Sequence, residues 1–212
     1  MGSLYGTVKY QTRDDMKQEQ DISASERLHR HRLLEGMAQA VAEKGYAETT
    51  IADIVRAAAV SRRTFYEHFP AKADCLVALY EAASRNALDV LRQAIDPAHD
   101  WEEQAEAALG AYFDCLSRNP VLMRTLFVEI LGLGAEGLAA RRRVNRELAD
   151  FMLQTVNGQG KRKPLSPDLA LAVVGGINEL VLRAIEQERV GRLRELTGVS
   201  VDLLRAVTRG AA

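Results

Sequence analysis

Two helix starts separated by a short break lie within residues 50–72, TIADIVRAAAVSRRTFYEHFPAK. Thr50 is followed three residues later by Asp53, which is the pattern of a capping box at a helix N-terminus. Apolar residues then recur at helical spacing until Ala59-Val60 interrupts them. Ser61 is a suitable N-cap for a second helix. The segment therefore predicts two short helices joined by a tight turn, the arrangement called helix-turn-helix.

The second of these helices has an apolar face and a polar face. Phe65 and Phe69 are four residues apart and are expected to face a core. Arginine can bond two acceptors on a guanine edge, and Tyr, His and Lys can contact phosphates. We therefore expect this helix to enter the DNA major groove, with Arg62 and Arg63 at base edges. The residues expected to contact DNA are Thr50, Ser61, Arg62, Arg63, Thr64, Tyr66, His68 and Lys72.

Over about residues 27–80 the sequence resembles the DNA-binding domain of tetracycline-repressor-type (TetR-family) regulators. That family's pattern is Ala-x-x-Ala-Gly-Val-Ser followed by x-x-Thr-x-Tyr-x-His-Phe-x-x-Lys, and this chain has RAAAVSRRTFYEHFPAK. Two positions depart from the pattern. Ala59 stands where the family usually has Gly, and a positive φ there would cost about 1 kcal/mol. Ala71 stands where a capping Ser or Asn is common.

The resemblance implies an all-α protein in two domains. An N-terminal three-helix helix-turn-helix domain, residues 26–72, would bind DNA, and residues 73–212 would form a C-terminal helical domain for effector binding and dimerisation. The implied function is a homodimeric, ligand-responsive transcriptional regulator, most often a repressor. Its partners would be a palindromic operator in double-stranded DNA and a small-molecule effector held in the C-terminal domain.

Residues 1–25 are polar and have no helical period, so we expect them to form a disordered arm. Its basic residues could reach the DNA minor groove, whereas the acidic residues among them favour a solvated tail. These basic residues are Lys9, Arg13 and Lys17.

The overall composition limits the other possibilities. Hydrophobic residues make up 47% of the chain and aromatic residues 6%, with abundant helix formers, so an all-helical core is favoured. The net charge of −1 means that DNA binding must come from a local basic patch. No apolar run is long enough for a transmembrane helix, and no signal peptide is recognisable, so we expect a cytoplasmic protein without membrane contact.

The chain has two cysteines, Cys75 and Cys115, which is too few for a disulfide framework. Buried structural thiols are the favoured interpretation, and a redox switch is the alternative. No cofactor or metal site is expected.

The rest of the chain reads as a series of helices. A first helix is expected over residues 25–44, with Gly45 as its stop, and a long helix over residues 72–95. Asp100, Asn119-Pro120 and Ser166-Pro167 are expected to start later helices, and another helix should occupy residues 135–156. Residues 157–164, NGQGKRKP, are expected to form a loop.

The helix predicted for Pro167–Arg189 is apolar on almost every side. Such a helix must be covered on every side, which is difficult in a monomer of this size. We therefore predict that it pairs with its copy across a two-fold axis, together with a last helix at Val201–Thr208. The resemblance agrees, because the family's dimer is a four-helix bundle of this kind.

Candidates for an effector pocket are less distinctive. Several large side chains could line a cavity or equally form plain core, and two polar residues within apolar helix need partners if they are buried. Glu179 could also pair with Arg183, four residues away. The pocket candidates are Trp101, Tyr112, Phe113, Met123, Phe127, Met152, Asn178 and Glu179.

Two other functions fit the sequence less well than a ligand-responsive regulator. A helical enzyme would need a nucleophile, an acid–base pair or a metal cluster, and the four histidines show no ligand spacing. No catalytic residue is therefore expected. An architectural DNA binder without an effector is disfavoured by the nearly neutral charge.

Overall fold

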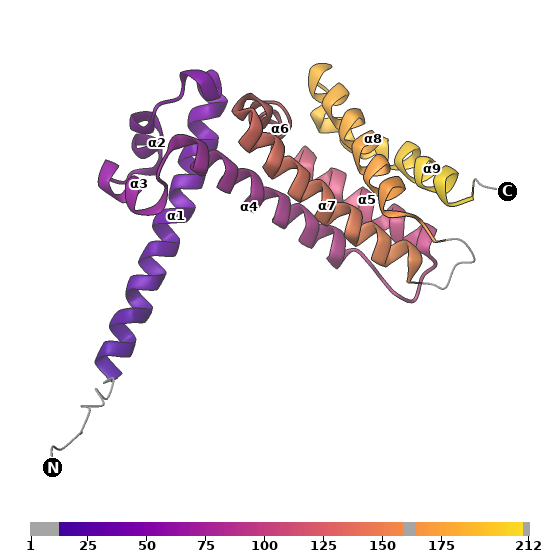
Figure 1. Cartoon of the computed structure of the whole chain (residues 1–212), viewed down its shortest axis with the longest axis horizontal. Helices are drawn as coiled ribbons and strands as arrows, with labels where there is room; N and C mark the ends of the chain where they lie inside the picture. The colour runs from indigo at the N-terminus through magenta and orange to yellow at the C-terminus, as the bar shows by residue number, and fades with distance from the viewer. Residues whose placement is uncertain (1–12, 159–163, 210–212) are drawn as a thin grey trace, which may run out of the picture.

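The structure, a computed structural model, describes residues 13–158 and 164–209, and in this part of the chain all regular elements are helices. Figure 1 shows α1 to α3 as a separate lobe from which α4 leads into a bundle formed by the later helices. The elements are α1 (Arg13–Glu48), α2 (Ile51–Ala58), α3 (Arg62–His68), α4 (Lys72–Gln93), α5 (Trp101–Ser117), α6 (Pro120–Phe127), the 3-10 helix η1 (Glu129–Leu133), α7 (Ala135–Asn157), α8 (Pro167–Glu186), the 3-10 helix η2 (Val190–Glu195) and α9 (Leu196–Arg209).

The first helix is longer than expected. α1 begins at Arg13, so the expectation of a disordered arm and a start at residue 25 is wrong for residues 13–25. This stretch has no apolar period, but it is rich in residues of high helix propensity such as Lys, Glu, Gln and Met. The rest of the expected arm, residues 1–12 with Lys9, lies outside the described residues.

The end of α1 follows the prediction more closely. Gly45 has a φ of 78°, a value that favours glycine, and it interrupts the helical geometry at the expected stop. A short helical continuation then runs to Glu48 and brings the chain to the start of α2.

The N-terminal lobe is held together by a small, fully buried core. Leu33 and Met37 of α1 pack with side chains from the next three helices, Ile54, Phe65 and Leu76, and all five have no exposed surface. α1 and α2 approach closely at Gly36, where an added Cβ would lie 2.6 Å from the carbonyl oxygen of Ile54. α2 is therefore seated directly on the backbone of α1, which fixes the position of the helix-turn-helix.

Three of the later helices, α5, α6 and α8, begin where the sequence predicts. The carboxylate of Asp100 accepts hydrogen bonds from two N–H groups at the start of α5. Asn119 and Ser166 accept equivalent bonds at the starts of α6 and α8, each followed by a proline in the first helical turn. The predicted loop after α7 is described only in part, because residues 159–163 lie outside the described residues.

α8 is apolar on two sides, and only one of them is covered. Its inner face, including Val173, Ile177 and Val181, is buried in the bundle. Leu169 and Leu171 on another face are almost half exposed. α9 packs beside α8 and starts at Leu196, earlier than the expected Val201.

Cys75 is fully buried, and burial raises the pKa of its thiol to about 12. It is therefore protonated at neutral pH and packs as a small apolar side chain, as the structural interpretation expected. Within the described residues there is no group of three or more His, Cys, Asp or Glu placed to hold a metal ion. None of the described helices is both long enough and apolar enough to cross a membrane.

Candidate nucleic-acid interface and effector cavity

The start of α2 is fixed by a complete capping box. The Thr50 N–H donates to Asp53 Oδ2 at 2.9 Å, and the Asp53 N–H donates to Thr50 Oγ1 at 3.2 Å. Lys44 of α1 lies 2.6 Å from the same carboxylate oxygen. The bonds from Lys44 and Thr50 hold the pKa of the Asp53 carboxyl well below its usual range. Asp53 therefore stays anionic at neutral pH and ties α2 to α1.

The turn between α2 and α3 contains the strained residue that the sequence pointed to. Ala59 has φ 51° and ψ 44°, in the left-handed region where a Cβ is unfavourable. The Val60 N–H bonds back to the carbonyl of Val55 at 3.1 Å, which closes the end of α2. The turn adopts the conformation that a glycine would favour although glycine is absent.

α3 starts at Ser61, whose Oγ accepts a hydrogen bond from the Thr64 N–H at 3.0 Å. The hydroxyl of Thr64 lies 2.8 Å from the same oxygen. Phe65 and Phe69 are buried and contact each other, so the expected apolar face of this helix is confirmed. The opposite face is therefore turned to solvent.

That solvent-facing side carries two arginines and a tyrosine. The Arg62 guanidinium lies 5.9 Å from the ring centre of Tyr66, which is about half exposed. Arg63 pairs with Glu67 at 2.9 Å, although 89% of its side chain is exposed. An ion pair this exposed contributes little, so Arg63 can exchange Glu67 for another partner at small cost. His68 is half-buried beside His29, with ring centres 6.4 Å apart.

Lys72 has a different environment from the one expected for a phosphate contact. Its ammonium group donates to the carbonyl oxygens of Tyr46 at 2.8 Å and Thr49 at 2.7 Å. It also lies 4.1 Å from the centre of the Tyr46 ring, a cation–π geometry. These contacts occupy most of the donors of Lys72 and hold the start of α4 against the end of α1.

Glu129 of η1 also bonds the end of α1. Its Oε2 accepts a hydrogen bond from the Tyr46 N–H at 3.2 Å, and its Oε1 lies 3.7 Å from Arg124 of α6. The end of α1 is therefore bonded to α4 through Lys72 and to the C-terminal bundle through Glu129. The sequence signal for this contact was a single acidic residue between two apolar ones, Val128 and Ile130.

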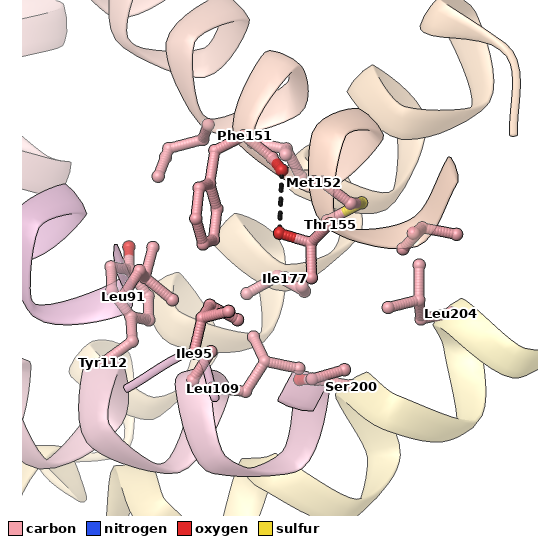
Figure 2. A pocket seen from close by; sticks show the side chains of 15 residues that line it. Leu91, Ile95, Leu109, Tyr112, Phe151, Met152, Thr155, Ile177, Ser200 and Leu204 are labelled. Atoms are coloured by element: carbon pink, nitrogen blue, oxygen red, sulfur yellow. Dashed lines mark hydrogen bonds between the residues drawn. The ribbon is translucent and has the colours of Figure 1, made fainter. Parts of the chain in front are cut away.

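The C-terminal bundle contains a partly open apolar cavity of about 70 Å³. Figure 2 shows Tyr112 and Leu91 on one side of it and Leu204 on the opposite side. The Thr155 hydroxyl donates to the Phe151 carbonyl at 3.1 Å, whereas the fully buried Ser200 hydroxyl has no partner among the described residues. The lining residues are Leu91, Ile95, Ala105, Ala108, Leu109, Tyr112, Leu148, Phe151, Met152, Thr155, Val156, Val174, Ile177, Ser200 and Leu204.

A second cavity of about 40 Å³ adjoins the first and has a more polar wall. Burial raises the pKa of the Tyr80 phenol to about 12, although Arg141 and a hydrogen bond with Ser84 act in the opposite direction. The amide of Asn178 donates to the side-chain oxygen of Asn145 at 3.1 Å. This cavity is lined by Tyr80, Ala83, Ser84, Ala87, Tyr112, Leu116, Leu126, Phe127, Arg141, Val144, Asn145, Leu148 and Asn178.

The sequence-predicted pocket residues divide into two groups. Tyr112 lines both cavities, Met152 lines the first, and Phe127 and Asn178 line the second. The other four lie elsewhere: Phe113 and Met123 are buried core, Trp101 is half-buried away from these cavities, and Glu179 is exposed on α8.

The sequence reasoning missed Arg141 and Ser200. Arg141 belongs to a run of three arginines, and it precedes Val144, Asn145 and Leu148 at helical spacing. That spacing places it on the same inward face of α7, and it could have been noticed. Ser200 had no comparable signal.

Comparison with known proteins places the N-terminal lobe in a described family. Residues 33–79 match the model "Bacterial regulatory proteins, tetR family". Over 94 residues the chain is 32% identical to the uncharacterised HTH-type transcriptional regulator YxbF of Bacillus subtilis, a match covering 44% of this chain and 25% of YxbF. Over 98 residues it is 26% identical to the HTH-type transcriptional activator FasR of Mycolicibacterium smegmatis, covering 46% of this chain and 45% of FasR. These matches span less than half of either relative.

The fold of the whole chain also matches solved structures. The transcriptional regulator FadR of Bacillus subtilis, solved in complex with stearoyl-CoA, superposes with a TM-score of 0.72 at 17% sequence identity. The match covers 86% of this chain and 99% of that one. At this identity it establishes a shared fold for the N-terminal lobe and the C-terminal bundle.

Proposed function

The chain belongs, through its N-terminal domain, to the tetR family of bacterial regulatory proteins, and we propose that it is a homodimeric, ligand-responsive regulator of transcription. The family is one of DNA-binding regulators and not of enzymes. The observation that carries the proposal is the capped α2–turn–α3 unit, whose outer face presents Arg62, Arg63 and Tyr66 to solvent. Such a regulator acts on the chromosome and so in the cytoplasm.

We assign the DNA-reading role to the outer face of α3. Arg62 and Arg63 would bond base edges in the major groove, with Thr64 beside them. Thr50, Tyr66 and His68 would contact phosphates, and Ser61 would hold the helix start that approaches the backbone. Lys72 would act mainly by positioning α4 against α1, because its ammonium group already bonds carbonyl oxygens.

The dimer interface in this proposal is formed by α8 and α9. The half-exposed leucines of α8, Leu169 and Leu171, and the exposed Val199 of α9 would be covered by the second copy. Gly175, where an added Cβ would meet nothing within 4 Å, would allow the helices to approach closely, whereas Gly176 already faces Leu203 of the same chain. Two-fold symmetry then places two α3 helices about 34–36 Å apart, one turn of a palindromic operator.

The effector in this proposal binds in the cavities of the C-terminal bundle. The structurally similar FadR of Bacillus subtilis was solved with stearoyl-CoA, which supports a small-molecule site in a bundle of this shape. We divide the chain accordingly into a DNA-binding domain, residues 26–72, and an effector-binding and dimerisation domain, residues 73–212. A dimer bound to its operator would act as a repressor by obstructing transcription, and the effector would release or modulate it.

Selection of bound sequences from random double-stranded DNA tests the DNA-binding part of this proposal. We expect a palindromic consensus whose half-site centres are about 10–10.5 base pairs apart, or a multiple of that spacing. Affinity for the consensus should fall steeply as salt rises. The assignment would be refuted if no consensus were recovered and an Arg62→Ala/Arg63→Ala double variant bound DNA as tightly as the wild type.

A further inference from the structure

The two cavities of the C-terminal bundle are neighbours with contrasting walls. Tyr112 and Leu148 line both of them, so the two spaces adjoin at these side chains. The first cavity is lined almost entirely by hydrocarbon, whereas the lining of the second includes a guanidinium, two phenols, a hydroxyl and two amides. A molecule that filled both would therefore need an apolar body and a polar end.

The polar cavity is positively charged. Its lining includes Arg141 and no Asp or Glu. Within the described residues no carboxylate pairs with Arg141, although Arg143, two positions later, pairs with Glu81 at 2.6 Å. A half-buried guanidinium without a carboxylate partner is a favourable site for an anion, and a planar carboxylate matches its donor geometry.

Neighbouring groups in this cavity can complete such a site. The Tyr80 phenol is neutral at pH 7 and can donate a hydrogen bond to an anionic oxygen. Asn178 gives one of its amide hydrogens to Asn145, and the amide nitrogen of Asn145 bonds no other described residue. The donors therefore outnumber the acceptors at this end of the bundle.

The volumes limit the size of the ligand. A space of about 70 Å³ holds about five or six groups of water size, and a space of about 40 Å³ holds about three. An open groove shares Ile95, Phe151 and Thr155 with the apolar cavity, so a path from solvent reaches this end. Together the two spaces suit a molecule of about ten non-hydrogen atoms, well below the size of an octadecanoyl chain.

We propose that the bundle binds a medium-chain carboxylate, with its head group at Arg141, Tyr80 and Asn145 and its hydrocarbon chain in the apolar cavity beyond Tyr112 and Leu148. This assignment rests on the proposed effector role of the bundle and adds the chemical class and orientation of the ligand. The ligand carboxylate lies in the second, more polar cavity, and its hydrocarbon chain points toward the open groove. A coenzyme A thioester would lack the negative charge that Arg141 requires at that end.

Calorimetric titration of the full-length protein with octanoate, octan-1-ol and octanoyl-CoA tests the head group. We expect octanoate to bind at least tenfold more tightly than either of the others. Arg141→Gln should weaken octanoate binding by about 10- to 100-fold and leave octan-1-ol unchanged, because only the ionic hydrogen bonds are lost. The matched control is Arg142→Gln, which alters the exposed neighbour and should bind octanoate like the wild type.

Several results would overturn the assignment. Equal affinity for octanoate and octan-1-ol would refute the anion site. Equal effects of Arg141→Gln and Arg142→Gln on the affinity for octanoate would refute it too. Affinity that continued to rise from octanoate to hexadecanoate would contradict the size limit. The melting temperature of each variant shows whether it is folded, and Tyr80→Phe provides a second, conservative test of the same head-group site.

The DNA selection experiment separates this inference from the function on which it depends. Operator binding without carboxylate binding would refute the ligand assignment and leave the DNA-binding regulator intact. Carboxylate binding by a protein that selects no DNA would refute the regulator and leave the site. Release of the selected DNA by octanoate, abolished in Arg141→Gln, would support both.

Discussion

At the scale of single residues, two side chains sit in positions that are locally unfavourable. Ala59 holds a left-handed backbone conformation in the turn before α3, and Ser200 buries a hydroxyl that has no partner among the described residues. Strain of either kind persists only where the surrounding structure determines it. Both residues therefore offer direct tests, because a single substitution should relieve each.

Ala59→Gly should stabilise the protein by about 0.5–1 kcal/mol, because glycine adopts the left-handed region without a Cβ penalty. The melting temperature should rise by about 2 °C in thermal unfolding. Ala57→Gly is the matched control: this exposed residue of α2 is helical, so glycine there should lower stability by a similar amount. A lower melting temperature in both variants would contradict backbone strain at Ala59.

Ser200→Ala should raise stability by about 1 kcal/mol, because it removes a buried hydroxyl that bonds nothing among the described residues. Thr155 lines the same cavity, but its hydroxyl bonds the Phe151 carbonyl. Thr155→Val removes this bond, so the substitution should leave the stability unchanged or lower it. Chemical denaturation of the two variants measures the difference. If the Ser200→Ala variant were the less stable of the two, the wild-type Ser200 hydroxyl would have to be hydrogen-bonded.

At the scale of helices, the proposed function gives α3 and α4 different roles in DNA binding. In this proposal α3 presents side chains to the groove, while Lys72 of α4, bonded to Tyr46 and Thr49, positions α4 against the N-terminal lobe. Substitutions in the two helices should therefore differ in kind. Contacts to bases change sequence preference, and positioning contacts change affinity for all sequences.

Arg63→Ala should relax base preference at one position in each half-site and cost about 1–3 kcal/mol of discrimination. The reason is that the arginine fork bonds two acceptors on one base, and its exposed pair with Glu67 is easily given up. Repeating the DNA selection with the variant measures the change. Glu67→Ala, which frees Arg63 without removing it, should keep the wild-type consensus, and an unchanged consensus in Arg63→Ala would refute the base contact.

Lys72→Met should weaken DNA binding on every sequence while leaving the salt dependence of the affinity unchanged, because no phosphate contact is removed. The melting temperature should fall as well, since carbonyl oxygens of Tyr46 and Thr49 lose their donor. Titrations at several salt concentrations distinguish the roles. A salt slope shallower by about 1 per subunit would instead identify Lys72 as a phosphate contact.

The sequence predicted the helices better than the contacts between them. Caps at Thr50, Ser61 and Asp100 are local patterns of three or four residues, so they could be read directly. The extra turns of α1 before residue 25 were missed because a polar helix has no apolar period. The bond of Lys72 to Tyr46 joins residues far apart in sequence, and no local pattern encodes such a pair.

Local sequence patterns also could not show which residues line the cavities. Tyr112 and Asn178 were identifiable as large or polar residues in apolar helices, but the sequence could not say which of the eight candidates meet around one space. Phe113 adjoins Tyr112 in sequence and yet is plain core, because successive helical residues point in different directions.

At the scale of the whole molecule, the exposed side of α8 should determine oligomeric state. Leu171→Glu should give a monomer in sedimentation velocity and abolish binding to a palindromic operator, because a charge replaces an apolar contact. Leu138→Glu is the matched control, since Leu138 of α7 is 45% exposed against 46% for Leu171. A dimer that survives the α8 change but not the α7 change would place the interface elsewhere.

The bonds at the end of α1 have a mechanical consequence for the assembly. Because Lys72 fastens the start of α4 to the N-terminal lobe, we expect α4 and that lobe to rotate together as a rigid body. The 22 residues of α4 span about 33 Å at about 1.5 Å per residue. A tilt of about 6° about the far end thus displaces α3 by about 3.4 Å, the rise of one base pair. In the proposed symmetric dimer the two displacements would add, so a small deformation around the cavity would shift the spacing of the two α3 helices away from the helical repeat of DNA.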